Sequence, residues 1–357
     1  KNPVDITGGG GELAYKKAME AAFAAPEIDA IVVLYCQTAT TNPDLLADYI
    51  IEVVKKYKKA KPFVIASIGG VAVDEMVDKL NENDIPAYDL PEKAISSLSA
   101  LYRWSNFVER TTKLGKPNGL KLPLDKIKAI IAKVRKEGRV QMLEHEAKEI
   151  FKLCNLHVPN YGLAKTKDKA INIAQKVGFP VVMKIVSEDI IHKSDAGGVF
   201  IGIKDLSEVE QTFDKIIENA KAYNPKANIR GVIISHMEPK ATEVIIGVTR
   251  DPTFGPTVMF GLGGIYVEIL KDVVFRVAPF SLEEAQHMID GIKTRDMLYG
   301  ARGQKPANID DLKHAIYVIS QLVSQVDDIK ELDINPMFAM EDKASVVDAR
   351  ITLTKQK

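Results

Sequence analysis

The loop Ser187–Val199 combines residue types that handle a phosphoryl group. It has the sequence SEDIIHKSDAGGV and directly follows an apolar segment that contains Lys184. A neutral imidazole such as that of His192 is a competent nucleophile and can accept a phosphoryl group. Lys184 supplies a fixed positive charge, and backbone N–H groups around Gly197 and Gly198 can approach a phosphate closely. Taken alone, a β-hairpin loop with a solvated histidine explains the same residues about as well.

Oxygen ligands gather near the C-terminus in two predicted β segments. ELDINPMF occupies Glu331–Phe338, and VVDAR occupies Val346–Arg350. Asp333, Asn335 and Asp348 supply carboxylate and amide oxygens, a set that suits Mg²⁺, which usually keeps water and phosphate among its ligands. A surface turn is the commoner meaning of an Asn-Pro dipeptide, so the metal site is a hypothesis at this point.

Two other segments carry weaker signals. VMFGLGGIYVE, over Val258–Glu268, has glycines that would let the backbone approach a ligand, although such a cluster more often marks a tight turn. YCQTATTNPD, over Tyr35–Asp44, precedes a predicted helix whose N-terminus could bind an anion. An ordinary helix cap with Pro43 in the first turn accounts for the same residues.

The elements that must position these residues change character along the chain. Ala30–Tyr35 and Pro62–Ser67 are β-branched runs without apolar/polar alternation, which is typical of strands buried on both faces of a parallel sheet. Helical spacing separates them, and the alternation of strand and helix predicts an open parallel α/β sheet. Helices are predicted at Glu12–Ala25, Pro43–Tyr57, Val73–Asn81 and Glu92–Leu101, with a third strand at Pro86–Leu90.

The rest of the chain predicts a mixed α+β domain. Lys113–Leu122, rich in lysine, glycine and proline, is predicted as a linker, and a charged helix follows at Asp125–Glu137. The predicted strands after it are Phe179–Val186, Gly231–Met237, Glu243–Val248, Thr257–Phe260, Asp272–Val277 and Ser345–Val347. The predicted helices are Glu144–Leu156, Lys169–Val177, Leu206–Ala222, Ser281–Ile292 and Asn308–Gln325.

Composition narrows the class of protein. A length of 357 residues fits two or three domains. Lysine and arginine total 48, as do aspartate and glutamate, so no positive surplus supports nucleic-acid or membrane binding. Two cysteines cannot form a disulfide framework, which favours a reducing, cytoplasmic location. The apolar runs fall far short of the ~20 residues of a membrane helix.

The ordered motifs resemble those of the ADP-forming acyl-CoA synthetases, in the succinyl-CoA synthetase superfamily. FPVVMKIVSEDIIHKSDAGGV, EVIIGVTRDPTFGPTVMFGLGGIYVE, GARG and ELDINPMF are similar to the ATP-grasp half of those enzymes, from Arg139 to about Leu353. The first hundred residues, from NPVDITGGG to KPFVIASIGG, resemble their flavodoxin-like ligase-CoA domain. The implied divisions are 1–110 (ligase-CoA, N-terminally incomplete), 111–138 (linker and helix) and 139–357 (ATP-grasp, with a small lobe at 159–229 and a large lobe at 139–158 and 230–357).

The resemblance also implies roles for individual residues. Lys184 matches a lysine that contacts nucleotide phosphates, and His192 matches a second phosphohistidine, which exchanges the phosphoryl group between a first histidine and the nucleotide. Asn335 and Asp348 match the Mg²⁺ ligands, while Asp333 has no assigned role. The other positions implied in nucleotide binding are Ser194, Asp195, Gly197, Gly198, Met237, Glu238, Glu243, Glu268 and Arg276. The helix start at Thr40–Asp44 resembles one whose dipole steadies a phosphohistidine.

The implied reaction is acid + CoA + ATP ⇌ acyl-CoA + ADP + phosphate, with Mg²⁺ and ATP/ADP bound and coenzyme A as a substrate. The implied partners are a CoA-binding domain and a domain with the first histidine, encoded upstream or in a second chain, together with a small carboxylic acid and phosphate. We expect the assembled enzyme to be an oligomer. We also expect this chain to be a C-terminal piece of a longer enzyme, or one of two chains, and catalytically incomplete alone.

Two other functions remain open on the sequence. Similar two-part chains occur as ligand-sensing modules fused to protein-lysine acetyltransferases, and other ATP-grasp proteins are carboxylate–amine ligases. The intact histidine motif and the pair Asn335 and Asp348 favour the acid–thiol ligase over the sensing module. The first domain argues against the carboxylate–amine ligase.

Overall fold

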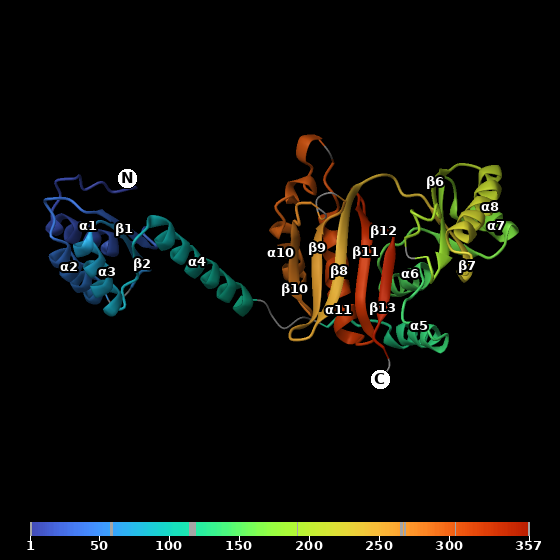
Figure 1. The fold of residues 1–357 in the computed structure, drawn as a ribbon, viewed down its shortest axis with the longest axis horizontal. Coiled ribbons are helices and arrows are strands. Elements are labelled where there is room, and N and C mark those ends of the chain that lie inside the picture. The colour runs from blue at the N-terminus through green and yellow to red at the C-terminus, as the bar shows by residue number, and fades with distance from the viewer. Residues whose placement is uncertain are drawn as a thin grey trace. The chain divides into compact units, whose positions relative to one another are not determined.

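The computed structural model describes residues 2–57, 60–113, 119–190, 192–264, 267, 269–303 and 305–355, the side chains of 110–113 and 302 excepted. The chain forms two compact units, Lys1–Lys113 and Leu114–Lys357 (Figure 1). Glu268 and part of the predicted linker lie outside the described residues. Within the described part of the chain, no helix has the length and apolar content needed to cross a membrane.

The first unit is a three-stranded parallel sheet in the order β1-β2-β3, which confirms the predicted α/β class. Helix α2 packs its apolar face against α1, α3 and one face of the sheet, and α4 covers β2 from the other side through Ala94. The strands are β1 (Ile31–Cys36), β2 (Phe63–Ile68) and β3 (Ala87–Tyr88). The helices are α1 (Glu12–Ala24), α2 (Pro43–Lys56), α3 (Val71–Glu82) and α4 (Pro91–Lys113).

Two expectations for the first unit are wrong. Strand β1 is buried on one face only, since Val33 and Tyr35 are buried whereas Leu34 is 59% exposed. It is an edge strand of the described sheet, and α4, which packs mainly on β2, reaches Val32 of β1 but leaves Leu34 exposed. Helix α4 runs to Lys113 instead of ending at Leu101, because the sequence between these residues contains no glycine or proline to stop it.

The second unit contains a small antiparallel sheet in the order β4-β7-β5-β6, covered by two helices. Its strands are β4 (Tyr161–Ala164), β5 (Val181–Ser187), β6 (Val199–Ile203) and β7 (Ile229–His236), and its helices are α7 (Lys167–Val177) and α8 (Leu206–Tyr223). Because β7 pairs with both β4 and β5, the small sheet continues to His236, past the lobe boundary expected at 229.

A larger antiparallel sheet, in the order β10-β9-β8-β11-β12 with β13 also on β11, forms the rest of the unit. Apolar side chains on one face of this sheet pack against α5, α6, α10 and α11 in a single core. The strands are β8 (Thr242–Asp251), β9 (Gly255–Leu262), β10 (Val273–Val277), β11 (Ile329–Ala339), β12 (Ala344–Val346) and β13 (Ala349–Leu353). The helices are α5 (Leu124–Lys136), α6 (Glu144–Leu153), α10 (Leu282–Gly291) and α11 (Ile309–Gln325), with short 3₁₀ turns at Arg295–Met297 and Ala301–Gly303.

Successive side chains of β11 point to opposite faces of the large sheet, and this determines which of them can contact a ligand. Leu332 and Ile334 point into the helix-covered core, so their neighbours Asp333 and Asn335 lie on the opposite, open face. Helix α5 belongs to the same core, so the charged helix expected beside the linker packs as part of the second unit. Several helices begin at residues whose side chains accept a backbone N–H of the first turn; these N-caps are Asn42, Thr166, Asp205, Ser281 and Asn308.

Candidate functional site

A cavity of about 550 Å³ lies where the small sheet meets the C-terminal strands of the large sheet. Its walls come from three parts of the chain: the segment leading into α6, the end of β5 with the loop after it, and the strands β11 and β13. The structure brings together here the predicted residues His192, Ser194, Asp195, Asn335 and Asp348. Residues far apart in sequence therefore share one cavity.

Asn335 and Asp348 offer oxygen atoms from adjacent segments. The Asn335 N–H donates to the Asp348 carbonyl at 3.2 Å, which places the two residues side by side. Asp348 Oδ1 accepts the N–H of Ala349 at 2.8 Å, and Oδ2 accepts from Lys184 Nζ at 3.0 Å. Among the described residues, no three histidine, cysteine or acidic side chains are grouped to hold a metal by themselves. Two oxygen ligands fit Mg²⁺ nonetheless, because it accepts water and phosphate oxygens for the rest of its shell.

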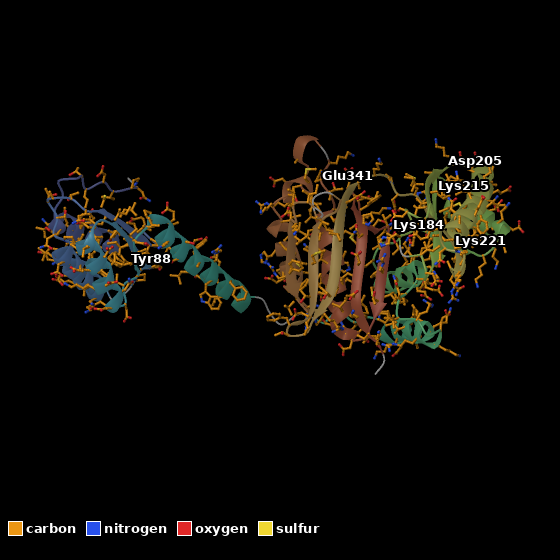
Figure 2. The ribbon with its side chains drawn as sticks, viewed as in Figure 1. Tyr88, Lys184, Asp205, Lys215, Lys221 and Glu341 are labelled. Carbon is orange, nitrogen blue, oxygen red and sulfur yellow. The ribbon has the colours of Figure 1, made fainter. Side chains whose placement is uncertain are left out.

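Lys184 links the two sheets. It extends from β5, and Figure 2 shows it in the second unit between the large sheet and the small sheet. Its Nζ lies between Asp348 Oδ2 and Glu144 Oε1, which are 3.0 and 3.2 Å away. Burial by itself would lower the pKa of Lys184, but the two carboxylates raise it to about 12. The ammonium group therefore stays charged beside two carboxylates that line the cavity.

Glu144 is a buried carboxylate that the sequence interpretation did not single out. Its Oε1 accepts from Lys148 at 2.9 Å and Lys184 at 3.2 Å, and its Oε2 accepts from Lys193 at 2.5 Å. Burial would raise the pKa of Glu144, yet the three lysines hold it well below its ordinary value. In sequence, a glutamate and a lysine four residues apart on an amphipathic helix resemble a solvated surface pair.

The loop between β5 and β6 differs from expectation in how it uses its glycines. The N–H groups of Ala196, Gly197 and Gly198 donate to carbonyls within the loop at 2.8–3.2 Å, rather than being left for a phosphate. Gly197 has a φ of +57°, which favours glycine. A Cβ on Gly198 would lie 2.5 Å from Ile185 Cγ2. These glycines shape the loop, and it is Ser194, Asp195 and the exposed His192 that line the cavity.

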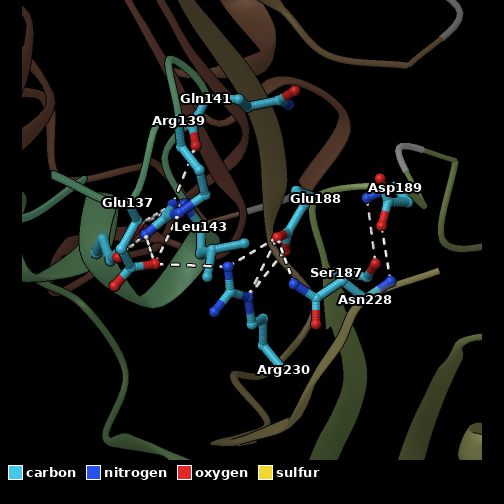
Figure 3. A network of polar contacts seen from close by, with 10 residues as sticks. Glu137, Arg139, Gln141, Leu143, Ser187, Glu188, Asp189, Asn228 and Arg230 are labelled. Carbon is cyan, nitrogen blue, oxygen red and sulfur yellow. Dashed lines mark hydrogen bonds and ion pairs between the residues drawn. The ribbon is translucent and has the colours of Figure 1, made fainter. Parts of the chain in front are cut away.

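A network of ion pairs fixes the segment that leads into this loop (Figure 3). Arg230 of β7 binds Glu188 through two nitrogens, at 2.8 and 3.1 Å. Arg139 binds Glu146 at 2.7 and 2.9 Å, and Glu137 contacts both arginines. Because Glu188 lines the cavity, the network ties one wall to the segment before α6 that forms another.

The connection from β7 of the small sheet to β8 of the large sheet, called the hinge below, contains Met237 and Glu238. The Met237 N–H donates to the Pro180 carbonyl at 2.9 Å. Glu238 is buried, and its Oε1 lies 3.1 Å from both Lys343 Nζ and Ser345 Oγ. Neither residue lines the main cavity. The contacts of Glu238 with Lys343 and Ser345 instead connect the hinge to β12 and the residue before it.

The remaining predicted residues lie on or behind the open face of the large sheet. Glu243 lines a hollow of about 850 Å³ beside the hinge, together with Gly263. Arg276 is not on this face: its Nε binds Glu284 of α10 at 2.7 Å, on the helix-covered side. Its strand neighbour Phe275 is the residue that faces the open side. The structure therefore places the Arg276 side chain on the side of the sheet where α10 packs, away from the open face.

Asp333 and Arg350 lie where the main cavity adjoins a shallow hollow of about 340 Å³. The two residues are register partners on β11 and β13. Burial raises the pKa of Asp333; Arg350 opposes this rise, and Asp348 adds to it. In sequence, Arg350 is only the last residue of the VVDAR motif and carries no signal of its own. The structure adds it to the residues that border the site.

The predicted anion site of the first unit is occupied by the chain itself. Asn42 Oδ1 accepts the N–H groups of Asp44 and Leu45 at 3.0 and 3.4 Å. The N–H of Asn42 donates to the Glu12 carboxylate. The backbone N–H groups at the start of α2 are thus bound by the N-cap side chain of Asn42 and by the carboxylate of Glu12.

Comparison with known proteins agrees with this arrangement. Residues 1–112 match the model of the ligase-CoA domain, and residues 133–353 match the model of the ATP-grasp domain. The 4-hydroxybutyrate–CoA ligase (ADP-forming) of Nitrosopumilus maritimus is 42% identical over 358 residues, covering 99% of this chain and 50% of that protein. The chain thus spans about half the length of that relative.

Two shorter proteins match the second unit. The beta subunit of acetate–CoA ligase (ADP-forming) I from Pyrococcus furiosus is 52% identical over 228 residues, covering 64% of this chain and 98% of the subunit. A solved structure of the dinucleotide-forming acetyl-coenzyme A synthetase 1 of Candidatus Korarchaeum cryptofilum has a TM-score of 0.58 and 39% identity, covering 64% of this chain and all of that one. It is a complex with coenzyme A and Mg-AMPPCP, with a phosphohistidine segment pointing towards the nucleotide binding site. The chain belongs to the family of ADP-forming acyl-CoA synthetases, of which it carries the ligase-CoA and ATP-grasp domains.

Proposed function

We propose that this chain supplies the nucleotide site and a phosphoryl-accepting histidine of an ADP-forming acyl-CoA synthetase. The overall reaction would be acid + CoA + ATP ⇌ acyl-CoA + ADP + phosphate. One observation carries the proposal: His192 lies on the same cavity as Asn335 and Asp348, with the charged Lys184 beside them. A nucleophile, a metal-binding pair and a phosphate-neutralising cation are the groups that phosphoryl transfer needs.

The residues fit Mg²⁺ and an adenine nucleotide. Asn335 and Asp348 would hold the ion, which when bound draws negative charge from phosphate oxygens. Lys184 adds a second positive charge at the same place and remains protonated because of its carboxylate partners. Ser194 and Asp195 border the same space from the loop, and the hinge at Met237 leads into the hollow that contains Glu243.

His192 would act through a ring nitrogen. In the direction of ATP use, this nitrogen bonds to the terminal phosphorus while the bond from that phosphorus to the bridging oxygen breaks, and ADP leaves. In the reverse direction, ADP takes the group back. Storage on histidine divides one transfer into two steps, so the acid and CoA need not meet the nucleotide directly.

Other parts of the enzyme would come from outside this chain. A CoA-binding domain and a domain with a first histidine are required by the reaction proposed, and a relative that matches the second unit is itself named a beta subunit. We therefore propose an assembly of several domains or subunits, with a small carboxylic acid, CoA and phosphate as the other reactants. The named relatives are ligases, which supports this function over a ligand-sensing module.

Phosphorylation of the chain by Mg-ATP tests the proposal. Incubation with γ-labelled ATP should give an acid-labile, base-stable phosphohistidine, and His192→Ala should abolish it. His314→Gln, which alters a histidine of α11 away from the cavity, is the matched control and should label normally. Label that persists in His192→Ala would contradict the assignment of the acceptor.

A further inference from the structure

Lys193, the neighbour of His192, makes an ion pair that spans the cavity wall. Its Nζ lies 2.5 Å from Oε2 of Glu144, and the lysine side chain is only 21% exposed. Lys193 comes from the loop after β5, whereas Glu144 begins α6. The pair therefore joins the histidine loop to a different part of the unit, next to the residue proposed to carry the phosphoryl group.

Glu144 is a fixed anchor for this contact. Its side chain is 1% exposed, and its other oxygen, Oε1, is held by Lys148 at 2.9 Å and Lys184 at 3.2 Å. Leu143, the residue before it, packs with Val186 and Ile233 of the small sheet. The carboxylate is thus set by groups outside the loop, and Oε2 is directed to Lys193.

The arrangement of charges also allows Lys193 to separate from Glu144. A buried charge that loses its sole partner is costly, typically by several kcal/mol. Glu144 would keep two lysines after Lys193 had left, so neither the glutamate nor the cavity would hold an unpaired charge. Lys193 is the most exposed of the three lysines and would regain water. The contact can therefore open without the penalty that an isolated buried pair would carry.

Other contacts of the loop act on its backbone and not on the His192 side chain. Gly198 N–H donates to the Lys193 carbonyl at 2.8 Å, and the side chain of Asn219 donates to the Gly197 carbonyl at 2.9 Å. These contacts hold the C-terminal side of the loop. The Ala196 N–H donates to the His192 carbonyl at 3.2 Å, but no side-chain hydrogen bond or ion pair holds the His192 imidazole in the part of the chain that the structure describes. The ion pair of the adjoining Lys193 is therefore the side-chain contact nearest to His192 that reaches outside the loop.

We propose that the Lys193–Glu144 pair is a releasable latch that holds the His192 loop against the nucleotide cavity. Lys193 is then a positioning residue: it acts on the reaction through His192. The latch itself follows from contacts of the unliganded chain, whereas its effect on phosphoryl transfer rests on the function proposed above. The two parts are tested by separate measurements.

Hydrogen exchange of the full chain without nucleotide tests the latch. In Lys193→Met, the amides of 196–198 should exchange at least about tenfold faster, because the loop opens more often. Lys193→Arg keeps the charge and should stay within about threefold of the unaltered chain. Lys167→Met removes a lysine of α7 that makes a 2.5 Å surface ion pair with Asp214, and it should leave these amides unchanged. Unchanged exchange in Lys193→Met overturns the latch.

The rate of His192 labelling by Mg-ATP tests the positioning role. We expect Lys193→Met to label at least about tenfold more slowly and Lys193→Arg to recover most of the rate. Faster loop exchange with normal labelling would overturn the positioning role. Slower labelling explained wholly by weaker nucleotide binding, with unchanged loop exchange, would make Lys193 a phosphate ligand and overturn the latch. If the unaltered chain takes no label, the proposed function and the positioning role fail together, and loop exchange still decides the latch.

Discussion

At the start of α2 in the first unit, the polar groups of the backbone are bound by nearby side chains of the same unit. Around the cavity of the second unit, by contrast, charged groups from three separate parts of the chain converge. Asn42 accepts two N–H groups of its own helix, and Glu12 accepts the N–H of Asn42. In the second unit, Lys184 and Asp348 meet from different sheets. A helix start is completed by residues a few positions away, but a reactive site needs groups that only the tertiary fold brings together.

The two regions therefore differ in what a substitution should do. Changes at the cavity should affect both stability and ligand binding, since its charges are buried and shared. Changes at the start of α2 should affect the stability of the first unit alone. Hydrogen exchange of the amides of the buried strand β2 reports on the stability of the first unit, while circular dichroism follows both units.

Glu144→Gln should have the largest effect. It leaves the fully buried Lys148 and its neighbour Lys184 without their shared carboxylate, and removal of one partner of a buried ion pair costs about 3–5 kcal/mol. We expect a loss in that range in the urea transition of the second unit, followed by circular dichroism. Glu149→Gln, on the exposed side of the same helix, should change it by less than about 0.5 kcal/mol. Equal effects of the two changes would show that the lysine cluster is not structurally important.

The same cluster predicts how stability depends on pH. The pKa of Lys184 is raised from 10.5 to about 12, so below pH 10.5 the lysine is protonated in both folded and unfolded chains and its ion pairs contribute fully. As the pH rises, the unfolded chain releases the proton first, and about 2 kcal/mol of stability should be lost in all by the time the pH has passed through 12, more than half of it by pH 11.5. Urea unfolding at pH 9, 10.5 and 11.5 measures this loss. In Lys184→Met the decline over that range should be shallower; an identical decline would assign it to other groups.

Asp348→Asn tests the proposed contribution of Asp348 to ligand binding. It weakens one of the two oxygen ligands proposed for Mg²⁺, and we expect the affinity for Mg-ADP to fall at least about tenfold, or ~1.4 kcal/mol. Titration calorimetry of the full chain gives this value. Glu12→Gln, the corresponding change of a carboxylate at the start of α2, should leave it unaltered. A loss of affinity in Glu12→Gln would show that the first unit contributes to the nucleotide site.

The sequence alone predicts the parallel sheet and the main strands of the second unit, because these segments are strongly apolar and have a clear period. It does not predict β4 or β6, which are only four and five residues long, and the predicted β segment VVDAR overlaps only the first two residues of β13. Residues of the cavity such as His192 and Asn335 were found through motifs. Glu144 was missed because burial of a charged helix start depends on what packs over it.

Arg276 shows a second limit of sequence interpretation. The strand β10, VVFRV, has no apolar/polar alternation that would tell which of its faces meets the helices. Placing the side chain therefore required knowing that α10 covers one side of the sheet and offers Glu284 there. A charged residue on a strand can be assigned to a site from sequence only when its neighbours fix the face.

Asn42→Ala should have the smallest effect and gives the sharpest comparison of the two regions. Loss of the N-cap removes the acceptor for the N–H groups of Asp44 and Leu45, which should lower the stability of the first unit by about 1 kcal/mol. Hydrogen exchange of the β2 amides measures it, and Asn42→Ser, which keeps a capping oxygen, should recover most of the loss. Mg-ADP affinity should remain unchanged in both variants, because the start of α2 is completed by Asn42 and Glu12 and needs no ligand. Weaker phosphate or nucleotide binding in Asn42→Ala, with affinity restored in Asn42→Ser, would mean that the helix start binds an anion after all and that the contrast between the two units is false.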